Sequence, residues 1–266
     1  MFPFRNVLFP DDSVNAQAAL KYATAFAQYG HGQVVLFNVQ DAKTELASKI
    51  AQAAIDHDID LITVALRDRN LLTRAFGSSL AEDIIAESPC AVLAVRPPQR
   101  DFVNGQSEIE LKRVLLATNF RPSSVAATQL ATQMSNQLGA ELHAVYVIGD
   151  YFEQISVMFP EGGLAALTRL RSYVEERMAQ LARGCGATHI AEGRPYQEIV
   201  KLADTLQADL IVIGTAVHGS LFGSSQVLGS EIERVIRNAP CPVLCVPAAR
   251  VVTPLPALVT QIVPQT

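Results

Sequence analysis

Tryptophan is absent from this chain of 266 residues, aromatic residues make up only 6% of it, and cysteine occurs four times. The cysteines form no Cys-x-x-Cys pair, which argues against a disulfide scaffold, so we expect free thiols. The five histidines have no metal-ligand spacing relative to the cysteines, which predicts no metal site. No charge-free apolar stretch forms a membrane helix of roughly 18–20 residues, and no signal-peptide pattern is present. These absences predict a soluble cytoplasmic protein.

Neither sign of charge is in large excess in this sequence. Lys and Arg number 21 against 26 Asp and Glu, so the formal net charge is −5, and no basic run stands out. Proteins that bind nucleic-acid backbones or anionic lipids usually present a basic patch. We therefore expect neither nucleic acid nor a membrane among the partners of this chain.

Two parts of the chain resemble each other, and this repeat predicts the architecture. A short apolar strand that ends in Asp or Asn occurs at residues 7–12 and again at 114–119. Each is followed by an apolar stripe with the period of a helix, then by glycine, and then by a second strand at 34–39 or 142–147. Strands that alternate with helix-length segments predict right-handed crossovers and a buried parallel sheet.

The later strands of the repeat match as well. The Asp-Leu-Ile sequence at Asp60 returns at Asp209, and the Pro-Cys strand at 89–95 returns at 240–246. Between its second strand and its Asp-Leu-Ile strand, the first copy is shorter by about 42 residues, an interval that holds a helical stretch and a short strand in the second copy. We therefore expect the first copy to lack one strand and one helix.

The expected fold is α/β, with two doubly wound lobes that are each built on a parallel sheet. The truncated first domain is predicted at residues 1–98 and the complete second domain at 113–250. Residues 99–112 are polar, follow Pro97 and Pro98 and contain Gly105, so they are predicted to be the linker. Residues 251–266 are uncharged and contain three prolines, which predicts an extended tail.

A glycine-rich segment follows the strand at 209–213. Residues 214–230 contain four glycines and no Lys or Arg, so His218 is the one candidate cation there. Backbone N–H groups of such a loop can approach an anion closely, and the helix behind it offers unpaired donors. Phosphate binding and an ordinary connection both fit this pattern. Ser230 has capping-box spacing to Glu233, so a role for Ser230 as the helix cap is a second interpretation.

The pattern as a whole resembles the universal stress protein family in a tandem, two-domain form. The resemblance rests on the strand-plus-acid opening at 7–12, its variant at 117–120, the Gly193-x-Pro195 helix start, the glycine-rich loop and the strand at 239–246. It implies an adenine nucleotide alpha hydrolase-like sheet with strand order 3-2-1-4-5 and dimerisation through the last strand. In one subclass it implies ATP bound by Gly-x2-Gly-x9-Gly-Ser/Thr.

This resemblance implies an adenine nucleotide, ATP or AMP with or without Mg²⁺, in the second domain. The chain departs from the family motif because Gly214 and Gly219 are separated by four residues instead of two. Asn119 stands where ATP-binding members carry an adenine-side Asp. Glu231 and Glu233 are expected to lie near a phosphate and to repel it. The expected nucleotide contacts are Asn119, Val147, Gly214, Thr215, His218, Gly219, Gly229 and Ser230.

The corresponding loop of the first copy lacks the glycines of the motif. Aligned through the later strands, it runs from Ala65 through Asp68 to Ser79, and no glycine occupies the three glycine positions. Asp68 would place a carboxylate where a phosphate belongs, whereas Ser79 and Glu82 keep capping-box spacing. We therefore expect the first copy to be structural.

Two alternatives remain open at this point. The chain could be a nucleotide-free interaction protein whose lobes form an intramolecular pseudo-dimer through 91–95 and 243–246, with or without a further homodimer. It could also be an enzyme, since slow ATP hydrolysis occurs in this family. No base or cation for that reaction is evident in the sequence, so we expect no catalytic residue.

Overall fold

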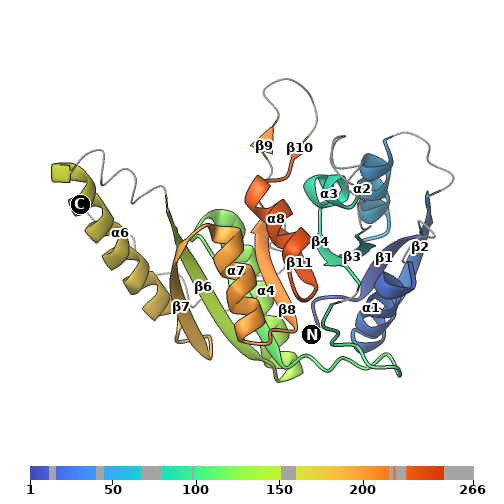
Figure 1. The fold of residues 1–266 in the computed structure, drawn as a ribbon. Coiled ribbons are helices and arrows are strands. Elements are labelled where there is room, and N and C mark those ends of the chain that lie inside the picture. Colours follow the sequence, from blue (N-terminus) through green and yellow to red (C-terminus); the bar gives the residue numbers. More distant parts are fainter. Residues whose placement is uncertain are drawn as a thin grey trace, which may run out of the picture.

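A single nine-stranded sheet forms the centre of the computed structural model, in the order β2-β1-β3-β4-β11-β8-β5-β6-β7 (Figure 1). Helices cover both faces of this sheet. The expected α/β class is therefore confirmed, with the strands of both copies joined in one sheet. The structure describes residues 1–11, 16–39, 45–66, 80–97, 99–150, 160–215, 218–219 and 226–248.

The first half of the chain contributes four strands that are parallel to one another. They are β1 (Asn6–Asp11), β2 (Gln33–Asn38), β3 (Leu61–Ala65) and β4 (Ala91–Val95). The helices of this half are α1 (Ala16–Tyr29), α2 (Leu46–Asp56) and α3 (Leu80–Glu87). Because β2 lies at the end of the strand order, it is an edge strand of the described sheet.

The second half contributes five strands in the order β7-β6-β5-β8-β11, which is the expected order 3-2-1-4-5. The strands are β5 (Arg113–Ala117), β6 (Glu141–Gly149), β7 (Ala187–Gly193), β8 (Leu210–Thr215) and β11 (Val243–Pro247). The helices are α4 (Pro122–Leu138), α6 (Pro160–Leu181), α7 (Pro195–Thr205) and α8 (Ser230–Asn238). These five strands are parallel to one another.

The two halves meet where β4 pairs with β11, and this pair is antiparallel. Leu93 lies opposite Leu244 in the register, and both side chains are fully buried. Beside this pair, Glu82 at the start of α3 is 2% exposed and binds Arg237 at the end of α8, with 2.6 Å between Oε1 and Nη2. The Glu82 carboxylate thus makes an ion pair between the halves.

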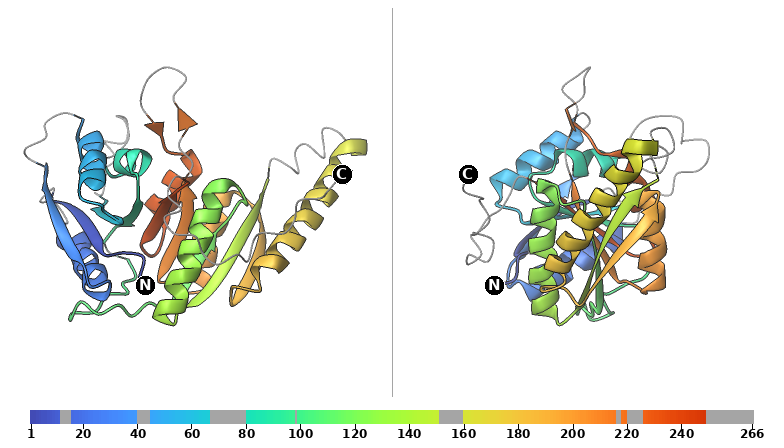
Figure 2. Two further views of the ribbon diagram at one scale, coloured as in Figure 1. Left: turned by 180° about the vertical axis from the view of Figure 1, so that it is seen from behind. Right: turned by 90° about the vertical axis from the view of Figure 1, so that its left-hand side faces the viewer.

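The hydrophobic core has two layers, one on each face of the sheet. One layer lies under α1, α4 and α6 and includes Phe26, Val114 and Met134. The other lies under α2, α3, α7 and α8 and includes Ile85 and Val235. Figure 2 shows α4 and α6 on the same side of the sheet. Each layer contains residues of both halves, so the core continues across the junction.

The repeated Asp-Leu-Ile sequences have the same structural role in both halves. The Oδ2 atom of Asp60 accepts hydrogen bonds from the N–H groups of Arg5 and Asn6, both at 3.1 Å. The Oδ2 atom of Asp209 accepts from the N–H groups at the start of β5, at 2.9 and 2.8 Å. Each aspartate therefore fixes the amino end of the first strand of its half.

The segment expected to be a linker, residues 99–112, is packed into the fold. Phe102 is buried in the layer under α1. The Nη1 atom of Arg100 donates to the carbonyls of Ala203 and Ala208, both at 3.2 Å, near the end of α7. A cation is favourable there because the last carbonyls of a helix lack partners within the helix. The segment therefore holds the halves together as well as connecting them.

Helix α4 packs closely on β8 at Gly214. A Cβ atom at this position would contact the backbone carbonyl of Ser123 and would lie 2.8 Å from the backbone nitrogen of Ser124. Backbone atoms in a packed helix cannot move aside as the end of a flexible side chain can. Glycine is therefore required at this position by helix packing alone.

We expect Gly214→Ala to lower the free energy of unfolding by about 1–3 kcal/mol, the usual cost of overpacking. Urea unfolding followed by circular dichroism measures this change. Gly105→Ala is the control, because a Cβ there meets no atom within 4 Å, and its effect should stay within about 0.5 kcal/mol. Equal stability of the two variants would contradict the close packing of α4 on β8.

The four cysteines are free, as expected, and they differ in burial. Burial raises the pKa of both Cys241 and Cys245 to about 12, whereas Cys185 is only partly buried. Thiolates are the reactive form. At pH 8 we expect a thiol reagent to modify Cys185 in the native protein and to reach Cys241 and Cys245 only after unfolding. If a Cys185→Ser variant still reacted rapidly with the reagent in its native state, this expectation would be refuted.

Candidate functional site

The second half has its topological switch point at β5, because β6 and β7 lie on one side of this strand and β8 and β11 lie on the other. In open parallel sheets, ligands bind beyond the carboxyl ends of the strands at such a point. The structure brings six of the eight expected contacts to this edge. Asn119 follows β5, and Val147 lies near the end of β6. Gly214 and Thr215 end β8, and Gly229 and Ser230 begin α8.

Asn119 shapes the turn between β5 and α4. Its Oδ1 atom accepts hydrogen bonds from the N–H of Arg121 at 3.1 Å and from the hydroxyl of Ser124 at 2.7 Å. In this turn Phe120 has a positive φ of 58°. The Asn119 side chain is exposed, and its Nδ2 group makes no hydrogen bond to a described residue. Oδ1 therefore serves the turn, and Nδ2 is the donor that a ligand can meet.

Val147 contributes backbone groups to the site. The β5–β6 register ends at Ala117 and Val145, and the N–H of Thr118 donates to the carbonyl of Val145 at 2.9 Å. Because residues two apart in a strand direct their backbone groups to the same side, the N–H and C=O of Val147 face the β5 side as well. β5 has ended at this level. Within the described sheet, Val147 therefore presents an unpaired donor and acceptor beside Asn119.

The end of β8 carries a hydroxyl group without a partner. Thr215 is 1% exposed, and its Oγ1 atom has no hydrogen bond among the described residues. A buried hydroxyl that lacks a partner costs free energy, and such groups often mark a site where a ligand or ion completes the bonding. Thr215 thus offers one polar group at the carboxyl end of β8.

The capping-box interpretation of Ser230 is wrong. The structure places Gly229 at the N-cap and Ser230 at the first helical position, and no side chain of the described residues caps α8. The carbonyl of Gly229 accepts from the N–H groups of Ile232 at 2.9 Å and Glu233 at 3.2 Å. The helix starts one residue earlier than its sequence suggests, so within the described part of the chain its first N–H groups lack a side-chain acceptor.

The carboxylate of Glu231, in the first turn of α8, has two partners, and its expected repulsion of a phosphate stays a prediction. Its Oε2 atom accepts from the N–H of Tyr196, in the first turn of α7, at 3.1 Å. Its Oε1 atom lies 3.2 Å from Nη1 of Arg234, whose guanidinium group lies over the Tyr196 ring. The negative charge is thereby balanced by the amino end of α7 and by Arg234.

The glycine-rich loop is described only in part. His218 and Gly219 form the short strand β9 (His218–Gly219), which pairs with β10 (Gln226–Val227) in an antiparallel hairpin. Figure 1 shows this hairpin beyond the amino end of α8. Nucleotide contacts by His218 and Gly219 stay a prediction. Asp68 and Ser79 of the first copy lie outside the described residues.

An aromatic cluster next to Asn119 was missed by the sequence analysis. The rings of Phe120 and Tyr146 stack with centroids 5.0 Å apart, and Tyr173 of α6 meets Phe120 edge-on at 6.1 Å. The guanidinium group of Arg177 lies 5.5 Å from the Phe120 centroid. Tyr173 and Arg177 are four residues apart on α6, a spacing that places them on one helix face. The cluster fastens α6 to the turn beside the candidate site.

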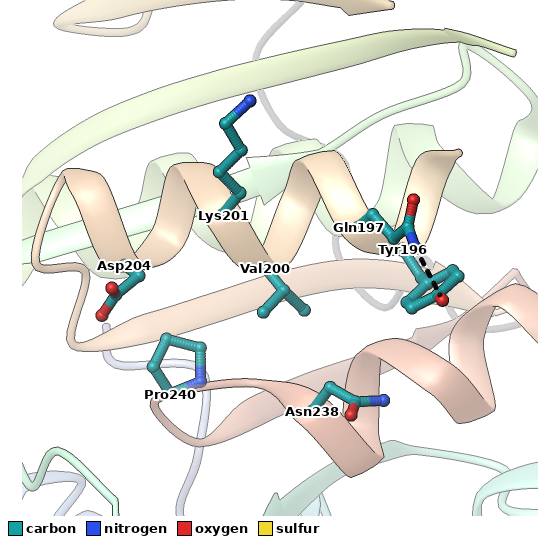
Figure 3. A pocket seen from close by; sticks show the side chains of 7 residues that line it. All are labelled: Tyr196, Gln197, Val200, Lys201, Asp204, Asn238 and Pro240. Carbon is teal, nitrogen blue, oxygen red and sulfur yellow. Dashed lines mark hydrogen bonds between the residues drawn. The ribbon is translucent and has the colours of Figure 1, made fainter. Parts of the chain in front are cut away.

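A surface hollow of about 450 Å³ lies along α7 and the end of α8. Figure 3 shows Val200 on α7 facing Asn238 and Pro240 across it. None of the expected nucleotide contacts lines this hollow. Its lining residues are Tyr196, Gln197, Val200, Lys201, Asp204, Asn238 and Pro240.

Among the described residues, no group of three or more His, Cys, Asp or Glu side chains could hold a metal ion. No helix in this part of the chain has both the length and the apolar character needed to cross a membrane.

Comparisons with known proteins agree with the fold. A universal stress protein of Methanocaldococcus jannaschii is 34% identical over 145 residues, which cover 51% of this chain and 81% of the relative. A universal stress protein of Thermus aquaticus is 33% identical over 138 residues, covering 51% of this chain and 98% of the relative.

Solved structures match over nearly the whole chain. A universal stress protein from Archaeoglobus fulgidus has a TM-score of 0.61 at 19% identity, covering 92% of this chain and 97% of that one. A functionally unknown protein from Pseudomonas aeruginosa has a TM-score of 0.66 at 19% identity, with coverages of 92% and 93%. These two matches show the shared fold.

The family model supplies the assignment. The model for the universal stress protein family matches residues 42–96 and 110–247, which together include strands of both halves of the sheet. The chain belongs to the universal stress protein family.

Proposed function

We propose that this protein is a stress-response module that binds an adenine nucleotide, ATP or AMP, at the carboxyl edge of the second half of the sheet. The observation that carries this proposal is the backbone of Val147, whose donor and acceptor face the β5 side of β6 beyond the last residue pair of β5 and β6. The edge of an adenine ring likewise carries a donor, its amino group, next to a ring-nitrogen acceptor. Two hydrogen bonds to one backbone residue would orient the base.

The phosphates would lie at the start of α8. No side chain among the residues that the structure describes caps its first N–H groups, and the amino end of a helix favours negative charge. Gly229 leaves room for close approach, and Thr215 supplies a hydroxyl group whose hydrogen-bonding capacity is unused among described residues. A Mg²⁺ ion, when present, would be held mainly by phosphate and water. In this proposal the chain binds and orients the nucleotide, and no residue is assigned a catalytic role.

A second candidate function is a nucleotide-free interaction protein. The antiparallel β4–β11 pair supports it, because this pair occupies the edge through which the family is expected to dimerise. In this alternative the halves form an intramolecular pseudo-dimer, and the carboxyl edge has no nucleotide. The titrations below distinguish the two functions.

We expect Gly229→Ala to weaken ATP binding by about tenfold, since losing one hydrogen bond to a charged group costs about 1.5 kcal/mol. A Cβ at Gly229 meets only the Cδ1 atom of Ile232, at 3.9 Å, and the backbone φ of −64° suits alanine. The fold should therefore be unchanged. Isothermal titration with ATP and AMP measures the affinity, and urea unfolding checks the stability.

Gly105→Ala serves as the matched control and should bind ATP as the unaltered chain does. The absence of heat from the unaltered chain at millimolar nucleotide would remove the proposal and leave the interaction protein. Unchanged affinity in Gly229→Ala would remove the start of α8 from the phosphate site.

The Asn119→Asp substitution tests whether the Asn119 side chain contacts the base of the nucleotide. Aspartate can still accept hydrogen bonds from Arg121 and Ser124, while the Nδ2 donor is exchanged for an acceptor. We expect the ratio of ATP to ITP affinity to rise several-fold, since adenine presents an amino donor where hypoxanthine presents a carbonyl acceptor. Competition titrations of both nucleotides measure this ratio. An unchanged ratio would place Asn119 away from the base.

A further inference from the structure

We propose that residues 257–263 of this chain dock as a strand on the outer edge of β2, in the position that β7 occupies beside β6. The outer edge of β2 is open in the described sheet, where the strand pairs only with β1, along all six of its residues. Its sequence, Gln-Val-Val-Leu-Phe-Asn, contains no charge and no proline. Native edge strands usually carry such features or are covered, because an open edge pairs with other strands.

The same position in the second half is fully covered. There β7 pairs with β6 along seven residues, and α6 lies over one face of both strands. The match between Val7 and Val114 aligns Leu36 of β2 with Ala144 of β6. Ala144 is 0% exposed, whereas Leu36 is 67% exposed. An apolar face and a strand edge that are buried in one half are therefore open in the other.

The chain beyond the described residues contains a segment of suitable composition. Residues 251–266 carry no charge, and within them residues 257–263 read Ala-Leu-Val-Thr-Gln-Ile-Val. Such β-branched and apolar runs favour strands. Pro256 and Pro264 bound the run on both sides, where proline ends a strand without interrupting its hydrogen bonds. The run is as long as β7, which has seven residues.

The chain can also reach this edge. Because β11 is antiparallel to β4, the carboxyl end of β11 lies at the same end of the sheet as the amino ends of β1 and β2. The new position lies five strand spacings from β11, or about 24 Å. Residues 248–256 can span about 30 Å when extended. A strand that starts beside the amino end of β2 runs parallel to β2, just as β7 runs parallel to β6.

Amide exchange of β2, measured by NMR, tests the proposal. The N–H of Gln33 donates to the carbonyl of Arg5 at 3.0 Å, so the N–H groups of Val34 and Leu36 point outward. We expect them to exchange at least about tenfold more slowly in the full chain than in a variant that stops after Arg250. Val35 is the internal control, because its N–H points toward β1 in both proteins.

Two single variants of the full chain provide a matched pair. Successive residues of a strand point their N–H groups to opposite sides, so only one of Val259→Pro and Thr260→Pro removes a donor that faces β2. We expect that variant to restore fast exchange at Val34 and Leu36 and the other to keep the protection.

Other outcomes would overturn the proposal. Equal exchange at Val34 and Leu36 in the full and shortened chains would exclude docking of residues 257–263. Protection that rises with protein concentration, together with a doubled mass in light scattering, would assign the edge to a second copy of the chain. Nucleotide binding does not enter this experiment, so its result is independent of the proposed function.

Discussion

The structure depends on the antiparallel pair of β4 and β11, which joins two parallel half-sheets that run in opposite directions. Because of this reversal, the carboxyl ends of the two halves lie at opposite edges of the sheet. Asn119 and Val147 therefore lie at the end of the sheet where the strands of the first half begin. The ion pair of Glu82 and Arg237 and the contacts of Arg100 reinforce the same junction.

The repeat could be predicted from the sequence because it depends on local patterns, whereas the strand order 3-2-1-4-5 was implied by the family resemblance. Apolar strands, glycines after helices and the recurring Asp60 and Asp209 are visible without coordinates, and the structure gives the two aspartates one role. The edge of the sheet that gathers Asn119, Thr215 and Gly229 follows from strand order as well. Parallel strands bring their carboxyl ends together wherever they are adjacent.

The remaining features depend on contacts between distant segments, which no local pattern reports. The packing of Phe102, the binding of Glu231 at the start of α7 and the stack of Phe120 on Tyr146 are of this kind. The start of α8 was mistaken by one residue because Gly229 and Ser230 both suit an N-cap. Gly214 shows the same difficulty, since a glycine expected at a phosphate is already required by the packing of α4.

The central strand pair has one further consequence, because both of its strands belong to a single polypeptide. A sheet assembled from two separate chains dissociates by mass action when it is diluted. Here residues 99–112 tether the halves covalently and pack against both, so scarcity of the protein cannot separate them. The candidate site of the second half therefore keeps its structural support at any cellular abundance.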